Sequence, residues 1–354
     1  MERHVREPGV VTFVRTVLGD IEPAALGVTY AHEHLVIDPG RATALFPDFL
    51  LEDVERMATE VAEAAALGLR ALVDAMPADT GRNASKLADL SRRTGVHIVA
   101  ATGVHHERFY GPAHWSSRLG EVELAELFRA DIEAGIDEHD YAGPIVRRTP
   151  HRAGIVKVAG SDGGPSARDT PIFIAAAEAH RRTGVPILTH CENGTGALEQ
   201  VRLLVDHGVP AGHIVLSHVD KVVDTGYHAE LLATGAFAEY DQSFRWGDAP
   251  NGTLALIEAM TAAGLDDRIV LGMDAARQGY YRAYGGSPGL AYLLDGFSRA
   301  MTERGLGAAT WRAFFIDNPA RAFAFAPPAS EPVGAAPGAS AATSATPTAT
   351  GRPS

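Results

Sequence analysis

The chain has 354 residues, 46% of them hydrophobic and 21% charged, a composition typical of a globular protein. Its formal net charge of −13 argues against nucleic acid or an anionic membrane surface as a partner. A single cysteine, Cys191, excludes an intrachain disulfide. Because neither a secretory signal nor a membrane-spanning apolar run is visible, we expect a cytoplasmic protein.

Two terminal segments are expected to lie outside the compact fold. Residues 1–10 are polar and charged, which predicts a flexible N-terminus. Residues 326–354 consist almost entirely of Ala, Pro, Ser, Thr and Gly, which offer too little apolar bulk to offset the entropy of ordering them. We therefore predict one folded unit at 11–325, followed by a disordered tail.

Strand and helix signals alternate along the folded unit. Residues 11–21 are β-rich and predict a short hairpin with its turn at Gly19 and Asp20, and residues 29–35 predict the first main strand. Further strands are predicted at 70–76, 97–104, 154–159, 186–191, 213–218, 236–240 and 268–273. Helices are predicted at 51–67, 84–94, 119–137, 171–183, 197–207, 227–234, 254–263 and 289–304, and several of them end at a glycine.

This alternation predicts an α/β fold. Strands separated by helices require right-handed crossovers and therefore run parallel. Eight such units favour a closed (β/α)8 TIM barrel over an open sheet, with the hairpin preceding it. No G-x-G-x-x-G follows the first main strand, which disfavours a dinucleotide-binding fold.

The first main strand carries the most informative motif, His32-Glu33-His34. Residues two apart on a strand project from the same face, so the two histidines point together and Glu33 points away. Buried imidazoles need partners for their ring nitrogens, and they are good ligands for zinc and related metals. An isolated His-x-His is nevertheless more often structural, so the rest of the chain must decide.

Chemically active residues recur at the carboxyl ends of the predicted strands, where the function of a parallel barrel gathers. Taken singly, a histidine there could be a hydrogen-bonded core residue, a lysine could form an ion pair, and an aspartate could cap the next helix. Their convergence at one end of one barrel favours a metal centre. The residues concerned are His32, His34, Lys157, His190, His218 and Asp274.

These motifs resemble the phosphotriesterase family of the amidohydrolase superfamily, over about residues 11–325. The resemblance rests on G-V-T-Y-A-H-E-H-L, G-I-V-K, T-H-C-E, L-S-H-V-D, L-G-M-D and the closing D-N-P-A-R. It implies a binuclear metal centre, usually zinc with manganese or cobalt as alternatives, in which the lysine of the fourth strand is carboxylated by CO2. It also implies a homodimer.

The resemblance further implies a role for each of these six residues. His32, His34 and Asp274 would bind the more buried metal. His190 and His218 would bind the more exposed one. The carbamate of Lys157 would bridge both together with a hydroxide, since an unmodified ammonium repels cations and has no lone pair to donate. The hydroxide would attack the substrate, and Asp274 would carry the proton to the leaving group.

The loops after strands seven and eight are expected to select the substrate. Arg245 lies in the first of these loops, and Arg277 and Tyr280 lie in the second. Guanidinium groups match phosphate or carboxylate, although ordinary ion pairing could equally account for each arginine. The second loop resembles the branch of the family that hydrolyses phosphorylated-sugar lactones, where basic and tyrosine side chains hold the phosphate; that branch tends to have lysine where this chain offers Arg245.

We therefore expect a lactonase that opens a polar or phosphorylated sugar lactone, with Arg245, Arg277 and Tyr280 binding the substrate. An organophosphate, carboxyl-ester or acyl-homoserine-lactone hydrolase is the alternative within the same chemistry, and aromatic residues such as Phe244 and Trp246 keep the last option open. A catalytically inert metal-binding or receptor-like barrel is the alternative from another class. Cys191 is expected to serve packing alone.

Overall fold

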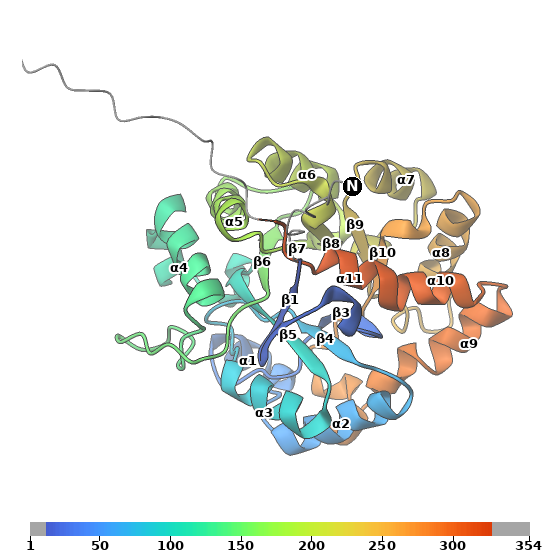
Figure 1. Ribbon diagram of the computed structural model, residues 1–354, viewed down its shortest axis with the longest axis horizontal. Helices are drawn as coiled ribbons and strands as arrows, with labels where there is room; N and C mark the ends of the chain where they lie inside the picture. The colour runs from blue at the N-terminus through green and yellow to red at the C-terminus, as the bar shows by residue number, and fades with distance from the viewer. Residues whose placement is uncertain (1–11, 328–354) are drawn as a thin grey trace, which may run out of the picture.

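The computed structural model describes residues 12–327, so the predicted flexible N-terminus and nearly all of the predicted tail lie outside the described residues. Eight parallel strands form the centre and helices surround them (Figure 1). In hydrogen-bonded order the strands are β3 (Thr29–Glu33), β4 (Ala71–Asp74), β5 (His97–Val104), β6 (Ile155–Gly160), β7 (Ile187–Cys191), β8 (Ile214–Ser217), β9 (Phe237–Tyr240) and β10 (Ile269–Leu271). The predicted (β/α)8 TIM barrel is confirmed.

The barrel closes between its first and last strands, just above the carboxyl end of β10. There the backbone N–H of Asp274 donates to the carbonyl of His32 at 2.9 Å, and that of Met273 donates to the same carbonyl at 3.3 Å. Residues of the first and last motifs that are expected to bind metal are therefore held together by the main chain itself.

The helices that separate the strands match the predicted ones in number and order up to β10. They are α2 (Val54–Ala66), α3 (Ala84–Thr94), α4 (Glu121–Glu133), α5 (Asp169–Thr183), α6 (Ala197–Asp206), α7 (Thr225–Ala233) and α8 (Gly252–Ala262). The predicted helix at 289–304 is wrong in its first half, because the chain forms a short 3-10 turn, Leu290–Leu293, and breaks at Asp295 before α9 (Gly296–Glu303). The short helices α1 (Arg41–Leu45), α10 (Ala308–Arg312) and α11 (Asn318–Ala322) were not predicted.

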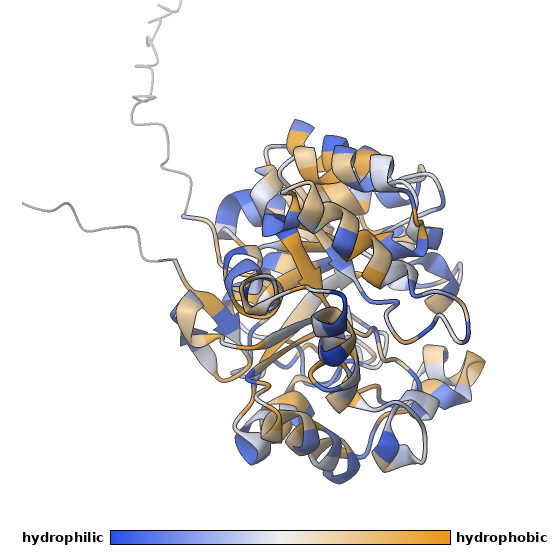
Figure 2. Ribbon diagram, turned by 90° about the vertical axis from the view of Figure 1, so that its right-hand side faces the viewer, coloured by the Kyte–Doolittle hydropathy of each residue, from blue (hydrophilic) through white to orange (hydrophobic). Residues whose placement is uncertain are grey.

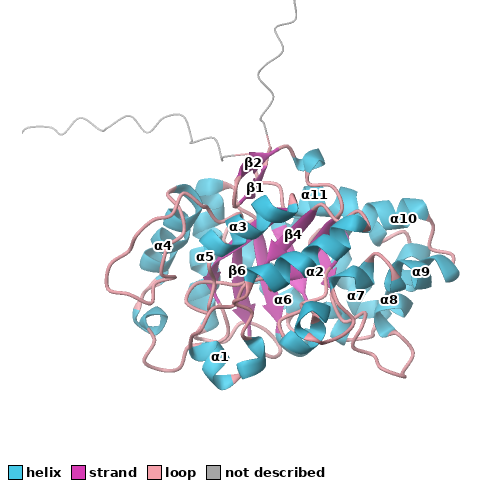
Figure 3. Cartoon of the chain, turned by 90° about the horizontal axis from the view of Figure 1, so that it is seen from below, coloured by secondary structure: helices cyan, strands magenta, loops and turns pink. Residues whose placement is uncertain are grey.

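The amino end of the barrel is sealed by the N-terminal hairpin and the last helix (Figure 3). The hairpin pairs β1 (Val14–Thr16) with β2 (Gly19–Ile21). Since Thr16 pairs with Gly19, the turn is at Val17 and Leu18, and the turn predicted two residues later is wrong. Beside the hairpin, the two ends of the described chain meet: the N–H of Phe325 donates to the carbonyl of Phe13 at 2.8 Å, and their rings stack 4.6 Å apart.

Apolar side chains fill the barrel from this sealed end upward. One buried cluster lies between the strands and the helices, and a smaller one lies inside the barrel. Figure 2 shows the hydrophobic residues gathered on the strands and on the inner faces of the helices. Members of the inner cluster include Ile155, Leu188, Val215, Phe237 and Val270, one from each of five consecutive strands. The carboxyl end of the barrel is left for polar residues. Within 12–327, the helices lack the combination of length and apolar character that crossing a bilayer requires.

Gly103 on β5 lies where this strand approaches β6 closely, near the carboxyl end of the barrel. A Cβ at this position would lie 1.8 Å from the carbonyl oxygen of Lys157, and the φ of +113° is one that side-chain-bearing residues rarely adopt. We predict that Gly103→Ala lowers the free energy of unfolding by about 3 kcal/mol or more, measured by urea denaturation. Gly143→Ala is the control, because a Cβ there meets no atom within 4 Å, and it should leave the midpoint unchanged.

Candidate metal centre

The alternation of side chains along the strands places the site. Stepping two residues toward the carboxyl end from the inner apolar cluster leads from Ile155 to Lys157, and from Leu188 to His190. The same step leads from Phe237 to Glu239. Polar groups on these strands therefore point into the barrel directly above its apolar filling.

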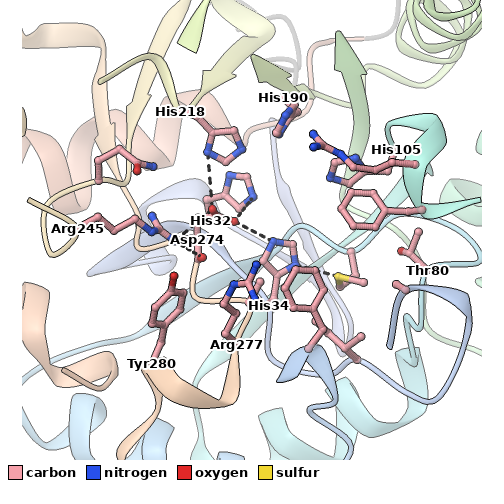
Figure 4. Close-up of a pocket in the computed structure, with 18 of the residues that line it drawn as sticks. His32, His34, Thr80, His105, His190, His218, Arg245, Asp274, Arg277 and Tyr280 are labelled. Atoms are coloured by element: carbon pink, nitrogen blue, oxygen red, sulfur yellow. Dashed lines mark hydrogen bonds and ion pairs between the residues drawn. The ribbon is translucent and has the colours of Figure 1, made fainter. Parts of the chain in front are cut away.

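Four imidazoles form a row across the upper barrel (Figure 4). The ring centres of His34 and His32 are 5.4 Å apart, those of His32 and His218 are 4.9 Å apart, and those of His218 and His190 are 4.6 Å apart. As the alternation predicts, Glu33 does not join the row; its carboxylate accepts the N–H of Met273 at 2.9 Å. All four histidines expected at the site therefore lie together.

Two residues reach the site through an unusual backbone conformation. His218 follows the last residue of β8 with φ of +66°, and Asp274 follows β10 with φ of +47°. Such angles cost residues other than glycine roughly 1 kcal/mol or more, so they persist only where the surroundings enforce them. In both cases the turn brings the side chain to the cavity.

Asp274 lies among the imidazoles. Its Oδ1 is 3.2 Å from Nε2 of His34 and 3.7 Å from Nε2 of His32. Burial alone would raise the pKa of Asp274, but His218, His34 and Arg245 beside it outweigh this and hold the pKa well below its usual range. Asp274 is therefore an anion whose oxygens converge with histidine nitrogens.

Lys157 is fully buried beneath this group, with Nζ 3.4 Å from Nε2 of His32 and 3.5 Å from Oγ of Ser217. Neither simple explanation of a buried lysine holds: the side chain does not reach solvent, and among residues 12–327 no carboxylate lies within 4 Å of its amine. Burial lowers the pKa of Lys157 to about 8, although nearby acids, Asp274 first, oppose the shift. The amine therefore loses its proton more readily than that of an exposed lysine.

Burial also keeps the imidazoles neutral. It lowers the pKa of His32 well below its usual range, and it lowers that of His190 to about 3. The pKa of His218 is lowered for the same reason. Neutral imidazole is the form that donates a lone pair to a metal ion.

A second set of side chains holds the histidines from behind. Nδ1 of His32 lies 3.1 Å from Oγ of Ser217 and 3.3 Å from Oε2 of Glu239, and Nδ1 of His218 lies 2.5 Å from Oδ2 of Asp241. Sequence analysis missed Glu239 and Asp241. The sequence contained a signal for them, because two acids that stand two positions apart, in and just after an otherwise apolar strand, cannot both be solvent-exposed in a barrel.

Glu192, next to Cys191, holds His190, the last histidine of the row. Its Oε2 lies 2.8 Å from Nε2 of His190, and the same carboxylate forms an ion pair with Arg108. The hydrogen bond from His190 is the main cause that lowers the pKa of Glu192 to about 2. Nε2 is thus occupied, and Nδ1 is the nitrogen that remains for a ligand.

A cavity of about 310 Å³ opens above the row of imidazoles. Besides the histidines and Asp274, its wall includes the basic residues Arg108, Lys221, Arg245 and Arg277 and the aromatic residues Phe49, Phe109 and Tyr280. His105, which follows β5, also lines the cavity; its ring centre lies 5.2 Å from that of His190, and it was not predicted. The cavity is more basic than the chain as a whole.

The three residues expected to bind substrate all line this cavity, but two of them also have partners in the protein (Figure 4). Arg245 donates to the carbonyl of Asp274 at 2.6 Å and to the carbonyl of Asp241 at 2.7 Å, and its guanidinium stacks on Phe244. Arg277 pairs with Asp48 at 2.5 Å. The ion-pairing alternative for the arginines thus describes part of what they do.

The donors present fit divalent metal ions. A nitrogen from each of His32 and His34 and an oxygen of Asp274 lie within 4.8 Å of one another. Hydrogen bonds from behind fix which nitrogen of His32 and His218 faces the cavity, as is usual for histidine ligands of metals.

Comparison with known proteins gives a consistent result. The sequence profile described as "Phosphotriesterase family" matches residues 12–323. A phospho-furanose lactonase of Mycoplasmopsis synoviae is 32% identical over 324 residues, which cover 88% of this chain and 92% of that protein.

Solved structures agree with the sequence match. A lactonase from Listeria monocytogenes superposes with a TM-score of 0.81 at 32% identity, covering 89% of this chain and 99% of that one. The phosphotriesterase homology protein of Escherichia coli, solved with phosphate in its active site, superposes with a TM-score of 0.77 at 30% identity, covering 84% and 99%.

Metal binding predicts a stability change. A ligand that binds only the folded chain, present at about 100 times its Kd, stabilises it by about 2.7 kcal/mol. We therefore expect Zn2+, Mn2+ or Co2+ to raise the Tm of chelator-treated protein by about 5 °C or more. Ca2+ is the control, because it prefers oxygen ligands, and equal shifts from Ca2+ and Zn2+ would contradict a histidine-rich site.

Proposed function

Because this chain belongs to the phosphotriesterase family, we propose that it is a metal-dependent lactonase that opens a polar or phosphorylated sugar lactone. The observation that carries the proposal is a single cavity in which buried metal donors meet basic side chains. The names of the Mycoplasmopsis and Listeria relatives support the reaction, and the phosphate in the E. coli protein supports an anionic substrate group.

The six expected ligands divide into two sets in this proposal. His32, His34 and Asp274 hold one divalent cation, and His190 and His218 hold the other. Zinc suits these donors, with manganese and cobalt as alternatives. Bound cations would supply an activated water as nucleophile and would polarise the lactone carbonyl.

Lys157 is proposed to act as its carbamate. The neutral amine attacks CO2, a C–N bond forms, and one proton is released, so the side chain becomes an anion with two oxygens. The position suits the role, because Nζ lies between the His32 imidazole and the strand that carries His218. Without this change the residue would bring a positive charge to a site that must hold cations.

Asp274 is proposed to move the proton. Its side chain keeps 24% of its surface exposed toward the cavity, whereas that of His32 keeps 1%. Arg245, 3.3 Å from Oδ2, fixes the outer oxygen of the carboxylate. In this role Asp274 accepts a proton from the attacking water and returns it to the ring oxygen that leaves the acyl carbon.

Arg277 and Tyr280, with Arg245 behind them, are proposed to bind the anionic group of the substrate. These side chains belong to the loops that follow β9 and β10 and face the cavity. Arg277 keeps 40% of its side-chain surface exposed despite its pair with Asp48, so the guanidinium can meet a second anion. A local basic wall is what an anionic substrate needs in a protein of net charge −13.

Replacement of Lys157 tests the metal chemistry. Lys157→Met keeps a side chain of similar length but removes the amine, and we predict that it loses most bound metal and at least about 100-fold of the lactonase activity. Metal content per chain and initial rates on sugar lactones are the measurements. Lys86→Met is the control, because Lys86 pairs with Asp38 away from the cavity. A fully active, metal-free Lys157→Met would refute the mechanism, and metal binding without turnover of any lactone or ester would favour the inert barrel.

Replacement of Arg277 tests the substrate class. We predict that Arg277→Ala raises KM for phosphorylated lactones about 10- to 100-fold, because a hydrogen bond to a charged group contributes about 1.5–3 kcal/mol. KM for unphosphorylated lactones should change little. Arg282→Ala is the control, since Arg282 lies in the same loop but points to Glu63 at 3.8 Å. Equal effects of Arg277→Ala on both kinds of lactone would contradict the role.

A further inference from the structure

We infer that Glu239 on β9 and Asp241 just after it are positioning residues that hold the ligands of both metal ions and thereby couple the two metal sites. The inference rests on the binuclear centre of the proposed function. It concerns side chains that touch neither cavity nor substrate, since Glu239 and Asp241 are fully buried and lie behind the imidazoles.

The geometry joins one acid to each metal set. Oε2 of Glu239 is 3.3 Å from Nδ1 of His32, and Oδ2 of Asp241 is 2.5 Å from Nδ1 of His218. One ligand-type atom from each of these four residues lies within 4.8 Å of the other three. Because Glu239 and Asp241 are two positions apart, both project from the same face into the barrel.

The acids decide which nitrogen each histidine presents. An acceptor oxygen beside Nδ1 holds the proton on that nitrogen, so the lone pair of the ring sits on Nε2. For His32 these oxygens belong to Glu239 and Ser217, and for His218 the oxygen belongs to Asp241. Nε2 of His32 faces Lys157 at 3.4 Å and Asp274 at 3.7 Å. Glu239 thus helps to turn the donor atom of His32 toward the place where the cations would bind, and Asp241 leaves Nε2 of His218 as the nitrogen free to donate.

These four residues do not themselves enclose a metal ion. Zinc bonds to nitrogen and oxygen are about 2.0–2.2 Å long, which keeps two ligand atoms of a tetrahedral ion roughly 3 Å or more apart. The 2.5 Å between Asp241 and His218 is a hydrogen-bond distance and leaves no space for an ion between them. The carboxylates therefore act through the histidines.

Glu239 is unfavourable for the fold alone, which points to a function. Its second oxygen, Oε1, is buried and has no hydrogen-bond partner among residues 12–327. The carboxyl group is also packed against β10, since a Cβ on Gly272 would lie 2.7 Å from Oε1. An apolar residue would fill this space without an unsatisfied polar atom, so Glu239 is better explained by its contact with His32.

Asp241 is held as firmly as the histidine that it positions. The carboxylate of Asp220 accepts the N–H of Asp241 at 3.2 Å and that of Gln242 at 2.9 Å, and Thr253 donates to the same carboxylate. The carboxyl end of β9 is thereby fixed against the turn that carries His218. A shift of this one strand end would move the supports of both metal sets together.

The test measures metal affinity rather than activity. The variants are Glu239→Gln, Asp241→Asn and the double variant, with the Zn2+ affinities of both sites determined by competition with a chelator and bound zinc counted per chain. We expect each single variant to lose about 10- to 100-fold in affinity, and the double variant to lose less than the product of the two single losses. Glu60→Gln is the control: Glu60 is a buried acid that holds loop backbone at Ala283 and Leu290 and touches no histidine, so affinity should not change.

The outcomes separate this inference from the proposed function. Wild-type protein that binds no zinc would overturn both. Wild-type protein that binds two zinc ions, with wild-type affinity retained in Glu239→Gln and Asp241→Asn, would overturn the positioning role alone, and strictly multiplicative losses would overturn the coupling. If Glu239→Gln does not fold, Glu239→Asp is measured instead; it keeps the charge and withdraws the carboxylate from His32, so undiminished affinity would again overturn the role.

Discussion

Burial of the Lys157 amine without an acid partner is the constraint on which the upper barrel depends. Lys157 is fully buried, has no ion pair among the described residues, and lies beside imidazoles that burial keeps neutral. Such a group is costly in a protein that contains no further ligand. The arrangement becomes reasonable when the lysine carries an anionic group and the imidazoles give their lone pairs to cations.

The basic side chains at the cavity wall are also balanced by groups of the protein itself. Each arginine at its wall is held by an acid or a carbonyl: Arg108 by Glu192, Arg245 by Asp274, and Arg277 by Asp48. These contacts fix the guanidinium groups in place without removing them from the cavity. An anionic substrate of the proposed kind would therefore meet a preorganised basic surface, while the acids behind it keep the whole site compatible with a strongly negative chain.

The features that follow from the periodicity of strands and helices could be predicted from the sequence. The features that depend on irregular backbone conformations could not. Strand and helix alternation located the barrel, and the carboxyl ends of the predicted strands pointed to Lys157 and His190, which lie beside the other histidines in the structure. The positive φ angles that bring His218 and Asp274 to the site could not be predicted from the sequence. Only the closure of the barrel and the packing around each turn enforce these angles. Glu239 was missed because it lies inside a strand, whereas active residues were sought at strand ends, and Asp241, directly after that strand, was not identified as a partner of His218. The hairpin turn was misplaced by two residues, since glycine favours turns but Gly19 pairs with Thr16.

The meeting of Phe13 and Phe325 at the amino end has a topological consequence. The N–H of one and the carbonyl of the other are already bonded, and Arg15 lies over both rings at 5.0 and 4.9 Å. The two ends of the described chain therefore lie side by side at the amino end of the barrel, on the side away from the cavity. This arrangement suits circular permutation, in which these two ends are joined and new termini are made in a surface loop elsewhere. A protein domain fused at either of these ends would begin on the side opposite the cavity.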